Sequence, residues 1–467
     1  MKNHKHTAPL DRFSEYAMAA ESDHYPKTDF SQFGFQGKID YCALCEAYSE
    51  ALADIPIFSS HLSERRNGFF YEPYWTYNHE IPNTLQVVDC RHMVQHPFDP
   101  MQFSTEYYKL RTRRRFDLSR EFPFNCSLLR VDDDKYIFSI LYHHSALDPN
   151  KAYRVLTGML QRYHEKVTGT PPEWVGSLGM AALKRSTALV KPIAPLTFMR
   201  DQLVDVWVKN RNGVVQTIAS EELLDYRKVK GRYSFRAVID DRKLLDSLMA
   251  RVKRNEATLN DLVFAVARKT LTAWNEERNI AAERFRFMLV TSLKGRMELP
   301  PNAGAGLAGL NFVSAGHQNA DLDTLIRFYR DNRRNQLARG IDIQFYNTLC
   351  KIVGAMRMFP MEVRHRLMDP LAASIPCTFY VSNLGVVWPR WENGRPTMDS
   401  AIIRVGDFEI NDVHSSASMG RSIGLGLTIR THNRRLFLNF VADRFRFRRL
   451  EVQELVNRIV ADLINAA

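Results

Sequence analysis

The stretch His143-His144-Ser145-Ala146-Leu147-Asp148 decides how the whole chain is interpreted. Residues 136–143, which lead into it, are mostly apolar and predict a buried strand. After Asp148, apolar residues recur at the three- and four-residue spacing of one helix face; they are Ala152, Val155, Leu156, Met159, Leu160 and Tyr163. The stretch is therefore predicted to be a turn between a strand and an amphipathic helix.

The polar residues of this turn suggest different roles. Successive side chains of a strand face opposite sides, so His143 and His144 are not expected to face the same cavity. Imidazole has the side-chain pKa nearest neutrality, and a neutral histidine in a cleft can remove a proton from a hydroxyl or amine. Adjacent histidines at a strand end are, however, more often structural. Asp148 followed by Pro149 predicts a helix N-cap with proline at the first helical position.

Strands and helices alternate along the rest of the chain. In the first part, strands are predicted at residues 33–37, 68–74, 85–89 and 125–131, and Asp40 caps a helix over 39–55. In the second part, the patterns predict strands at 233–239, 287–292 and 377–382, helices over 242–254, 259–274 (capped by Thr258) and 321–339, a hairpin turning at His432-Asn433 and a C-terminal helix. A proline-rich stretch with one helix at 198–209 separates the parts.

This pattern predicts two mixed α/β halves of similar size. The N-terminal half covers residues 1–175 and carries the two histidines, a crossover linker covers 176–231, and the C-terminal half covers 232–467. A length of 467 residues allows two to four domains.

Composition limits the partners and the compartment. The net charge of +12 and the pI of about 9.4 favour anionic partners, but no nucleic-acid motif accompanies the charge, so nucleic acid is not an expected partner. No secretory signal and no apolar run of membrane-spanning length occur, so a cytoplasmic setting is expected and membrane contact is not. Of the six cysteines, Cys42 and Cys45 form a C-x-x-C; core packing is expected for Cys45, with a redox pair as the alternative.

The turn and its surroundings resemble a known superfamily. His143-His144-x-x-x-Asp148, about one third along a chain of this length, resembles the HHxxxD acyltransferases and condensation domains of the chloramphenicol acetyltransferase-like fold. Further weak matches follow in the same order and extend over most of the chain: 9–13, 37–40, 258–261 and Ser382-Asn383-Leu384-Gly385. The resemblance implies an α/β fold of two-layer sandwiches, with two such subdomains forming a pseudo-dimer around a central tunnel.

The resemblance also implies residue roles. His144 would be the general base, with His143 a secondary candidate, and Asp148 would be structural, held by a cation from the second half. Lys294 or Arg296 would supply that cation. Ser382 and Asn383 would lie at the reaction centre and could stabilise an oxyanion, although a polar strand end is an equally good interpretation.

Three features depart from the superfamily. Pro149 stands where glycine usually follows the motif aspartate. The plant-type Asp-Phe-Gly-Trp-Gly motif is missing, and Gly406-Asp407-Phe408-Glu409 does not replace it. If Lys294 supplies the cation, the lysine would hold Asp148 less rigidly than arginine would.

The resulting functional hypothesis is an acyltransferase that moves an acyl group from a coenzyme A or carrier-protein thioester to a hydroxyl or amine. The alternatives are a stand-alone condensation enzyme acting on two carrier-bound substrates and a degenerate non-catalytic member of the superfamily. No metal and no tightly bound cofactor are expected, and the thioester would be a co-substrate. Two arginine clusters are candidates for docking the anionic donor: Arg327, Arg330, Arg333 and Arg334, and Arg444, Arg446, Arg448 and Arg449.

Other chemistry has little support. The sequence has no G-x-x-x-x-G-K-[ST] phosphate loop and no G-x-S-x-G nucleophile elbow. The glycine-rich run at 304–309 is interpreted as a flexible loop, because no helix pattern follows it closely.

Overall fold

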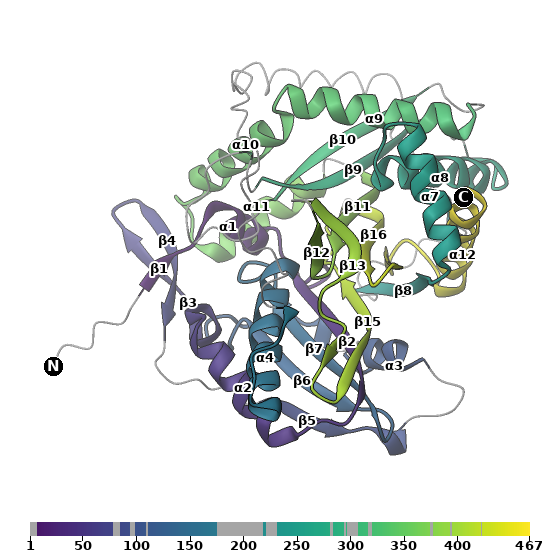
Figure 1. The fold of residues 1–467 in the computed structure, drawn as a ribbon. Helices are drawn as coiled ribbons and strands as arrows, with labels where there is room; N and C mark the ends of the chain where they lie inside the picture. Colours follow the sequence, from purple (N-terminus) through teal and green to yellow (C-terminus); the bar gives the residue numbers. More distant parts are fainter. Residues whose placement is uncertain are drawn as a thin grey trace.

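The computed structural model contains two six-stranded sheets covered by helices (Figure 1). It describes residues 7–77, 85–93, 99–108, 111–174, 218–220, 231–280, 284–293, 296, 307–315, 320–373, 377–392, 395–421 and 423–467. Within these ranges, no helix combines the length and the apolar character needed to cross a membrane.

The first sheet has the strand order β14-β15-β2-β7-β6-β5. Its strands are β2 (Thr28–Gly37), β5 (Gln86–Asp89), β6 (Phe124–Arg130), β7 (Lys135–His143), β14 (Arg404–Val405) and β15 (Phe408–Ser416). Although β15 belongs to the last quarter of the chain, it pairs antiparallel with β2 along its whole length, with Val413 opposite Phe33. Figure 1 shows the yellow-green β15 beside the purple β2.

Helices lie on both faces of this sheet. On one face are α2 (Tyr41–Ala53) and α4 (Pro149–Thr168), and the ring of Phe33 on β2 meets that of Tyr153 on α4 at 5.1 Å between centroids. Gln32, the preceding residue on β2, contacts Ser104 of α3 (Pro100–Tyr107). Because neighbouring strand residues face opposite sides, α3 lies on the face opposite α4.

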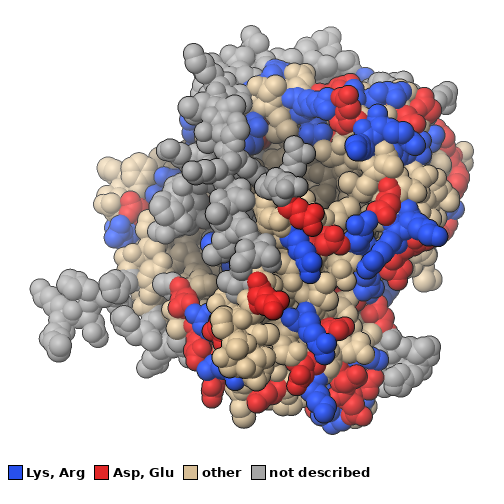
Figure 2. All heavy atoms as spheres, viewed as in Figure 1, with Lys and Arg blue, Asp and Glu red and all other residues tan. Residues whose placement is uncertain are grey.

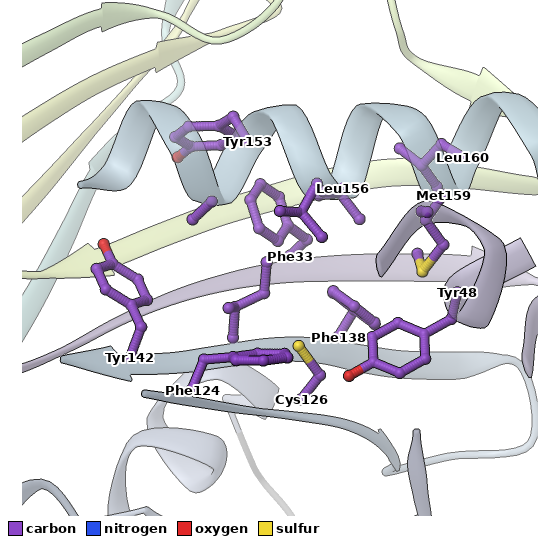
Figure 3. Packing of buried hydrophobic residues seen from close by; sticks show 14 of the residues in the cluster. Phe33, Tyr48, Phe124, Cys126, Phe138, Tyr142, Tyr153, Leu156, Met159 and Leu160 are labelled. Carbon is purple, nitrogen blue, oxygen red and sulfur yellow. The ribbon is translucent and has the colours of Figure 1, made fainter. Parts of the chain in front are cut away.

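The core of this half lies between the sheet and its two long helices (Figure 3). Phe33 and Phe138 rise from the sheet to meet Leu156 and Met159 of α4, with Tyr48 of α2 beside them, and each of these residues is fully buried. Burying a side chain of this size contributes roughly 1.5–3 kcal/mol. The helical stripe predicted after Asp148 is therefore the stripe that packs on the sheet.

The second sheet has the order β10-β9-β11-β16-β17-β8. Its strands are β8 (Arg232–Ile239), β9 (Arg284–Ser292), β10 (Leu307–Ala315), β11 (Cys377–Val386), β16 (Ile423–His432) and β17 (Arg435–Asp443). The helices of this half are α7 (Arg242–Arg254), α8 (Leu259–Glu276), α9 (Leu322–Ala338), α10 (Ile341–Met356), α11 (Met361–Ala373) and α12 (Arg449–Asn465). A second apolar core contains side chains from the sheet and from α7, α8, α9 and α12.

Smaller elements tie the halves together. A three-stranded sheet joins β1 (Thr7–Pro9), β4 (Phe70–Tyr77) and β3 (Ser60–Asn67), and β12 (Pro389–Glu392) pairs with β13 (Arg395–Ser400). The short helix α1 (Arg12–Ala19) contacts α10 and α11 of the second half. Phe13 of α1 shares an apolar cluster with Leu293 and with Ile343, Tyr346 and Leu349 of α10.

The prediction of two sheet-based α/β subdomains is confirmed, as are the Asp40 cap, the capping box of Thr258 and the helix over 242–254. Three local predictions need correction. Residues 68–74 are the turn of a hairpin and the start of its second strand, because Gly68 has φ +59 and β4 begins at Phe70. The later hairpin turns at Asn433-Arg434, one residue beyond the prediction, where both residues have positive φ. The glycine-rich run is not all loop, since β10 begins at Leu307.

The division by sequence does not match the division in space. Residues 404–416, assigned to the C-terminal half, complete the N-terminal sheet as β14 and β15. Of the predicted linker 176–231, only residues 218–220 and 231 are described, and the helix predicted at 198–209 lies outside the described residues. Cys45 packs against the first core as expected.

Candidate active site

The turn from β7 to α4 is held by short-range backbone bonds. The amide groups of Ala146 and Leu147 both donate to the carbonyl oxygen of His143, at 3.0 and 3.2 Å. α4 begins at Pro149, and the carbonyl oxygen of Asp148 accepts from Ala152 N–H at 3.0 Å, so Asp148 occupies the predicted N-cap position. Proline is favourable at the first helical position because it has a helical φ and no N–H to satisfy. Pro149 is therefore compatible with this turn.

The two histidines are separated as the strand alternation predicted. His143 is fully buried, and its Nδ1 accepts from Ser145 N–H at 3.1 Å. The ring proton is thereby placed on Nε2, which lies 3.4 Å from Glu21 Oε1. Both ring nitrogens of His143 thus face groups inside the protein, and this burial favours a structural role.

His144 has a different environment. Its side chain is 18% exposed, and its Nδ1 lies 2.9 Å from Oδ2 of Asp29, a carboxylate on β2 that is 2% exposed. A carboxylate beside Nδ1 favours the tautomer with the proton on that nitrogen, leaving the lone pair on Nε2. The edge of the Phe13 ring packs against the imidazole, with 5.7 Å between centroids. His144 thus combines a partly exposed imidazole with a buried carboxylate beside its Nδ1.

Asp29 is held by groups from both halves of the chain. Ser418 N–H, just beyond β15, donates to its Oδ1. Burial alone would raise the pKa of the Asp29 carboxyl, but His144, Arg232 and the Ser418 N–H together hold that pKa below its usual value. Asp29 is therefore ionised at neutral pH. It was not predicted from the sequence; the available signal was a carboxylate at the start of an otherwise buried strand.

The charge of Asp148 acts on a buried arginine of the second half that was not among the expected residues. Arg430 on β16 is 2% exposed, and its guanidinium carbon lies 4.0 Å from the centre of the Tyr153 ring. Burial lowers the pKa of Arg430, while the charges of Tyr153, Tyr142 and Asp148 act to raise it. The sequence signal for Arg430 was a charged residue inside an alternating apolar strand.

The structure gives Arg296 another partner. Its guanidinium pairs with Asp342 of α10 at 2.6 Å and donates to the carbonyl oxygen of Leu337. Arg296 follows β9, whereas β16, which carries Arg430, is two strands away in the sheet. Arg296 is therefore engaged with α10, its role beside Asp148 stays a prediction, and Lys294 lies outside the described residues.

Ser382 and Asn383 lie near the end of β11, opposite Thr428 and Ile429 of β16. The side-chain amide of Asn383 donates to Oδ1 of Asn260 on α8 at 2.8 Å, and its oxygen accepts from Gly385 N–H at 2.9 Å. These bonds support the strand-end interpretation for Asn383. An oxyanion role for Ser382 stays a prediction.

The first arginine cluster binds its own neighbours. Arg333 forms a two-pronged contact with Asp261, the buried carboxylate of the α8 capping box, at 2.9 and 3.0 Å. Arg330 and Arg334 donate to the carbonyl oxygens of Asn255 and Glu256, and Arg327 donates to the Asn255 side chain. Figure 2 shows acidic side chains among the basic ones on the face in view. The fork of Arg333 is occupied, so Arg333 is corrected to a residue that fixes α9 on α8.

The arginines of the second cluster have several different kinds of partner. Arg446 pairs with Asp443 and donates to the carbonyl oxygen of Arg421, and Arg448 is the N-cap of α12. Arg449 pairs with Glu106 of α3 at 3.2 Å, and the Arg444 guanidinium lies 5.3 Å from the Tyr233 ring centre. This cluster therefore lies at the junction of the halves. Among the residues described, no group of three or more His, Cys, Asp or Glu side chains could hold a metal ion.

The chain has the condensation and epimerization domain fold, the chloramphenicol acetyltransferase-like fold, over its whole length. It is similar to the first condensation domain of the calcium-dependent antibiotic synthetase, with a TM-score of 0.67 and 13% identity over 99% of this chain and 96% of that one. Polyketide synthase associated protein 5 from Mycobacterium tuberculosis has a TM-score of 0.60 and 15% identity over 98% and 97% of the two chains.

An epimerization domain of tyrocidine synthetase B is also similar, with a TM-score of 0.61 and 12% identity over 98% and 97%. No protein-family model matches the chain. One curated protein, a probable non-canonical nonribosomal peptide synthetase from Salinispora arenicola, is 25% identical over 138 residues. The match covers 30% of this chain and 2% of that protein.

Proposed function

We propose that the chain is an acyltransferase that moves an acyl group from a thioester, on coenzyme A or on a carrier-protein arm, to a hydroxyl or amine. The observation that carries the proposal is the pair His144–Asp29. The pair combines a partly exposed imidazole with a buried, ionised carboxylate 2.9 Å from its Nδ1. The fold is that of acyltransferases and condensation enzymes, which fits this chemistry.

In the proposed reaction, Nε2 of His144 removes the proton from the acceptor hydroxyl or amine as that group attacks the thioester carbonyl. A C–O or C–N bond forms, and the carbonyl becomes a tetrahedral oxyanion. Collapse of the oxyanion breaks the C–S bond, and His144 returns its proton to the leaving thiolate. Asp29 stabilises the imidazolium between the two proton transfers. The acceptor itself is the nucleophile.

The test is thiol release from a panel of acyl-coenzyme A and acyl-carrier donors with varied acceptors, comparing the wild type with His144→Ala. Loss of a positioned general base should reduce turnover by ~10²–10⁴-fold, while circular dichroism and melting temperature stay near those of the wild type. His143→Ala serves as the comparison and should cost stability more than turnover. A His144→Ala enzyme with near-full turnover would overturn the proposal.

A second candidate is a stand-alone condensation enzyme with both substrates on carrier proteins. The observation that favours it is the greater similarity to a condensation domain, with a TM-score of 0.67 against 0.60 for polyketide synthase associated protein 5. The donor and acceptor panel separates the candidates. A free acceptor that reacts as fast as a carrier-bound one supports the acyltransferase, whereas product formed only between two carrier-bound substrates supports condensation.

A further inference from the structure

A small pocket lies where the two halves meet. Thr112 and Arg113 line it from the first half, and Arg232 and Arg449 from the second. Its volume is about 30 Å³, and one water needs roughly 10–15 Å³ on this kind of measure. The pocket therefore admits a group of a few heavy atoms, and no group as large as a nucleotide base.

Several hydrogen-bond donors in this pocket have no protein partner among the described residues. They are Nε and Nη2 of Arg113 and Oγ of Ser416, and each of these atoms is buried. Buried donors are nearly always satisfied in folded proteins, because an unpaired one costs about 1–3 kcal/mol. Three such donors around one cavity suggest that a ligand with several acceptor oxygens completes the site.

The charges in and beside the pocket also favour an anion. Three arginines and one carboxylate, Glu106, line it, and Glu106 pairs with Arg449 at 3.2 Å. Burial lowers the pKa of Arg113, and the nearby charge of Arg444 lowers it further. Two neighbouring guanidinium groups repel each other unless an anion lies between them or beside them. Glu106 does not balance this charge alone.

Glycine at position 231 keeps Arg113 in place. Gly231 has φ +83, and a Cβ there would lie 2.8 Å from Cγ of Arg113. The arginine stem therefore packs directly against the backbone just before β8, and a larger residue at position 231 would displace it.

The pocket is linked to the candidate active site through Arg232. This residue lines the pocket, donates to the carbonyl oxygen of Thr28 at 2.7 Å, and its charge helps to lower the pKa of Asp29. Phe30 of the pocket and Asp29 are neighbours on β2 and so face opposite sides of the sheet. An anion in the pocket and a reacting group at His144 would lie at the same end of the sheet, on its two faces.

We propose that this pocket binds a phosphate monoester, with Arg113 and Ser416 as its principal donors. Guanidinium groups bind phosphate oxygens through two parallel bonds, and the hydroxyl adds a third donor. A phosphate that ends a flexible arm would anchor there, at the same end of the sheet as His144 and on the opposite face. The role of the pocket in acyl transfer rests on the proposed function, whereas phosphate binding does not.

The test is a calorimetric titration of the full-length protein with inorganic phosphate, phosphopantetheine and unphosphorylated pantetheine. Phosphopantetheine should bind saturably and compete with inorganic phosphate, and pantetheine should bind at least about tenfold more weakly. Arg113→Gln should weaken phosphopantetheine binding by about tenfold or more, and Ser416→Ala by a smaller factor. If inorganic phosphate binds and phosphopantetheine binds no better, the site would be one for free phosphate. The proposal that it binds the phosphate of a flexible arm would then be wrong.

The matched control is Arg91→Gln, since Arg91 is an exposed arginine that pairs with Asp89 and Asp133, away from the pocket. Its binding should equal that of the wild type. Absence of saturable phosphate binding, or equal losses in Arg113→Gln and Arg91→Gln, would overturn the proposal. The titration is repeated with His144→Ala, which should bind phosphopantetheine normally. A failure of phosphate binding is thereby distinguished from a failure of the proposed base.

Discussion

Asp29 and His144 are brought together by strand register. β2 and β7 pair antiparallel, with Asp29 opposite Tyr142. His144 follows Tyr142 by two positions, so Asp29 and His144 are diagonal neighbours on one face. Diagonal neighbours lie within reach of longer side chains. A one-residue slip of β2 would turn Asp29 to the other face. The contact between Asp29 and His144 therefore depends on how the two strands pair, and the local sequence around His144 does not predict it.

Replacement of Asp29 tests whether it positions the base. Asp29→Asn should lower kcat by a large part of the ~10²–10⁴-fold that a positioned base supplies, with little change in donor KM, because the amide no longer stabilises the imidazolium or selects its tautomer. Turnover checks this, with Asp54→Asn, an exposed carboxylate at the C-cap of α2, as the control. Unchanged turnover in Asp29→Asn would show that the contact has no catalytic value.

The ionisation of Glu21 makes the free energy of unfolding depend on pH. The pKa of its carboxyl is lowered to about 2, since His143, Arg115 and the Lys27 N–H outweigh the opposing effect of burial. The unfolded chain binds the proton at a higher pH, near the ordinary value of 4.5. The stabilisation is therefore complete above about pH 4.5 and is lost as the pH falls towards 2. It amounts to roughly 3 kcal/mol at most.

Urea unfolding at pH 7, 5, 4 and 3 measures this dependence. Glu21→Gln should be less stable than the wild type at pH 7, and its free energy of unfolding should fall less steeply below pH 4.5. Glu50→Gln, on the exposed face of α2, should follow the wild type. If Glu21→Gln loses stability with acid as steeply as the wild type, the carboxylate is not the group that titrates.

At the scale of elements, the turn between β7 and α4 combines a local and a distant support. The local support is the N-cap position of Asp148 with Pro149 at the helix start. The distant support is Arg430 on β16, which is buried against Tyr153 and acted on by the charge of Asp148. The helix that covers the first sheet is thereby tied to the central part of the second sheet.

A double-mutant cycle on Asp148 and Arg430 separates the two supports. Asp148→Ala should lose ~0.5–2 kcal/mol from the cap, plus about 3–5 kcal/mol if it leaves a buried charge unpaired. Arg430→Met keeps much of the side-chain volume and removes the charge. The double variant should then be more stable than the sum of the single losses predicts. Additive losses in chemical denaturation would show that the two residues do not interact.

At the scale of the whole molecule, the halves exchange elements. β14 and β15 leave the C-terminal part to complete the N-terminal sheet, and α1 leaves the N-terminal part to pack on α10 and α11. Tyr25 donates to Asp443 at 2.8 Å, and Arg236 bridges Asp99 and Asp412. Without the C-terminal half, the N-terminal half would expose apolar surface and an unpaired edge of β2.

Fragments test this mutual dependence. Residues 1–231 expressed alone should fail to fold, because β2 lacks β15 and the first core lacks Val405, Phe408 and Val413. Co-expression with residues 232–467 should restore a soluble complex with near-native circular dichroism. The intact chain should unfold in one cooperative transition. A monomeric, cooperatively folding 1–231 fragment would contradict the prediction.

The sequence by itself determined the elements and the motif. Helix caps such as Asp40 and Thr258, the apolar stripe of α4 and the turn after His143 depend on residues within a few positions of one another, so periodicity and short-range bonding predict them. The resemblance carried by the same motif predicted two sheet-based subdomains, and the structure confirms them. Local interactions were sufficient for each of these predictions.

Only the tertiary structure decided which distant residues meet. Asp29 reaches His144 through strand register, Arg430 of β16 packs on Tyr153 of α4, and β15 joins the sheet of the other half. These contacts join segments more than one hundred residues apart in the chain. Their geometry follows from how two sheets and their helices bury apolar surface together, and no local pattern records that arrangement.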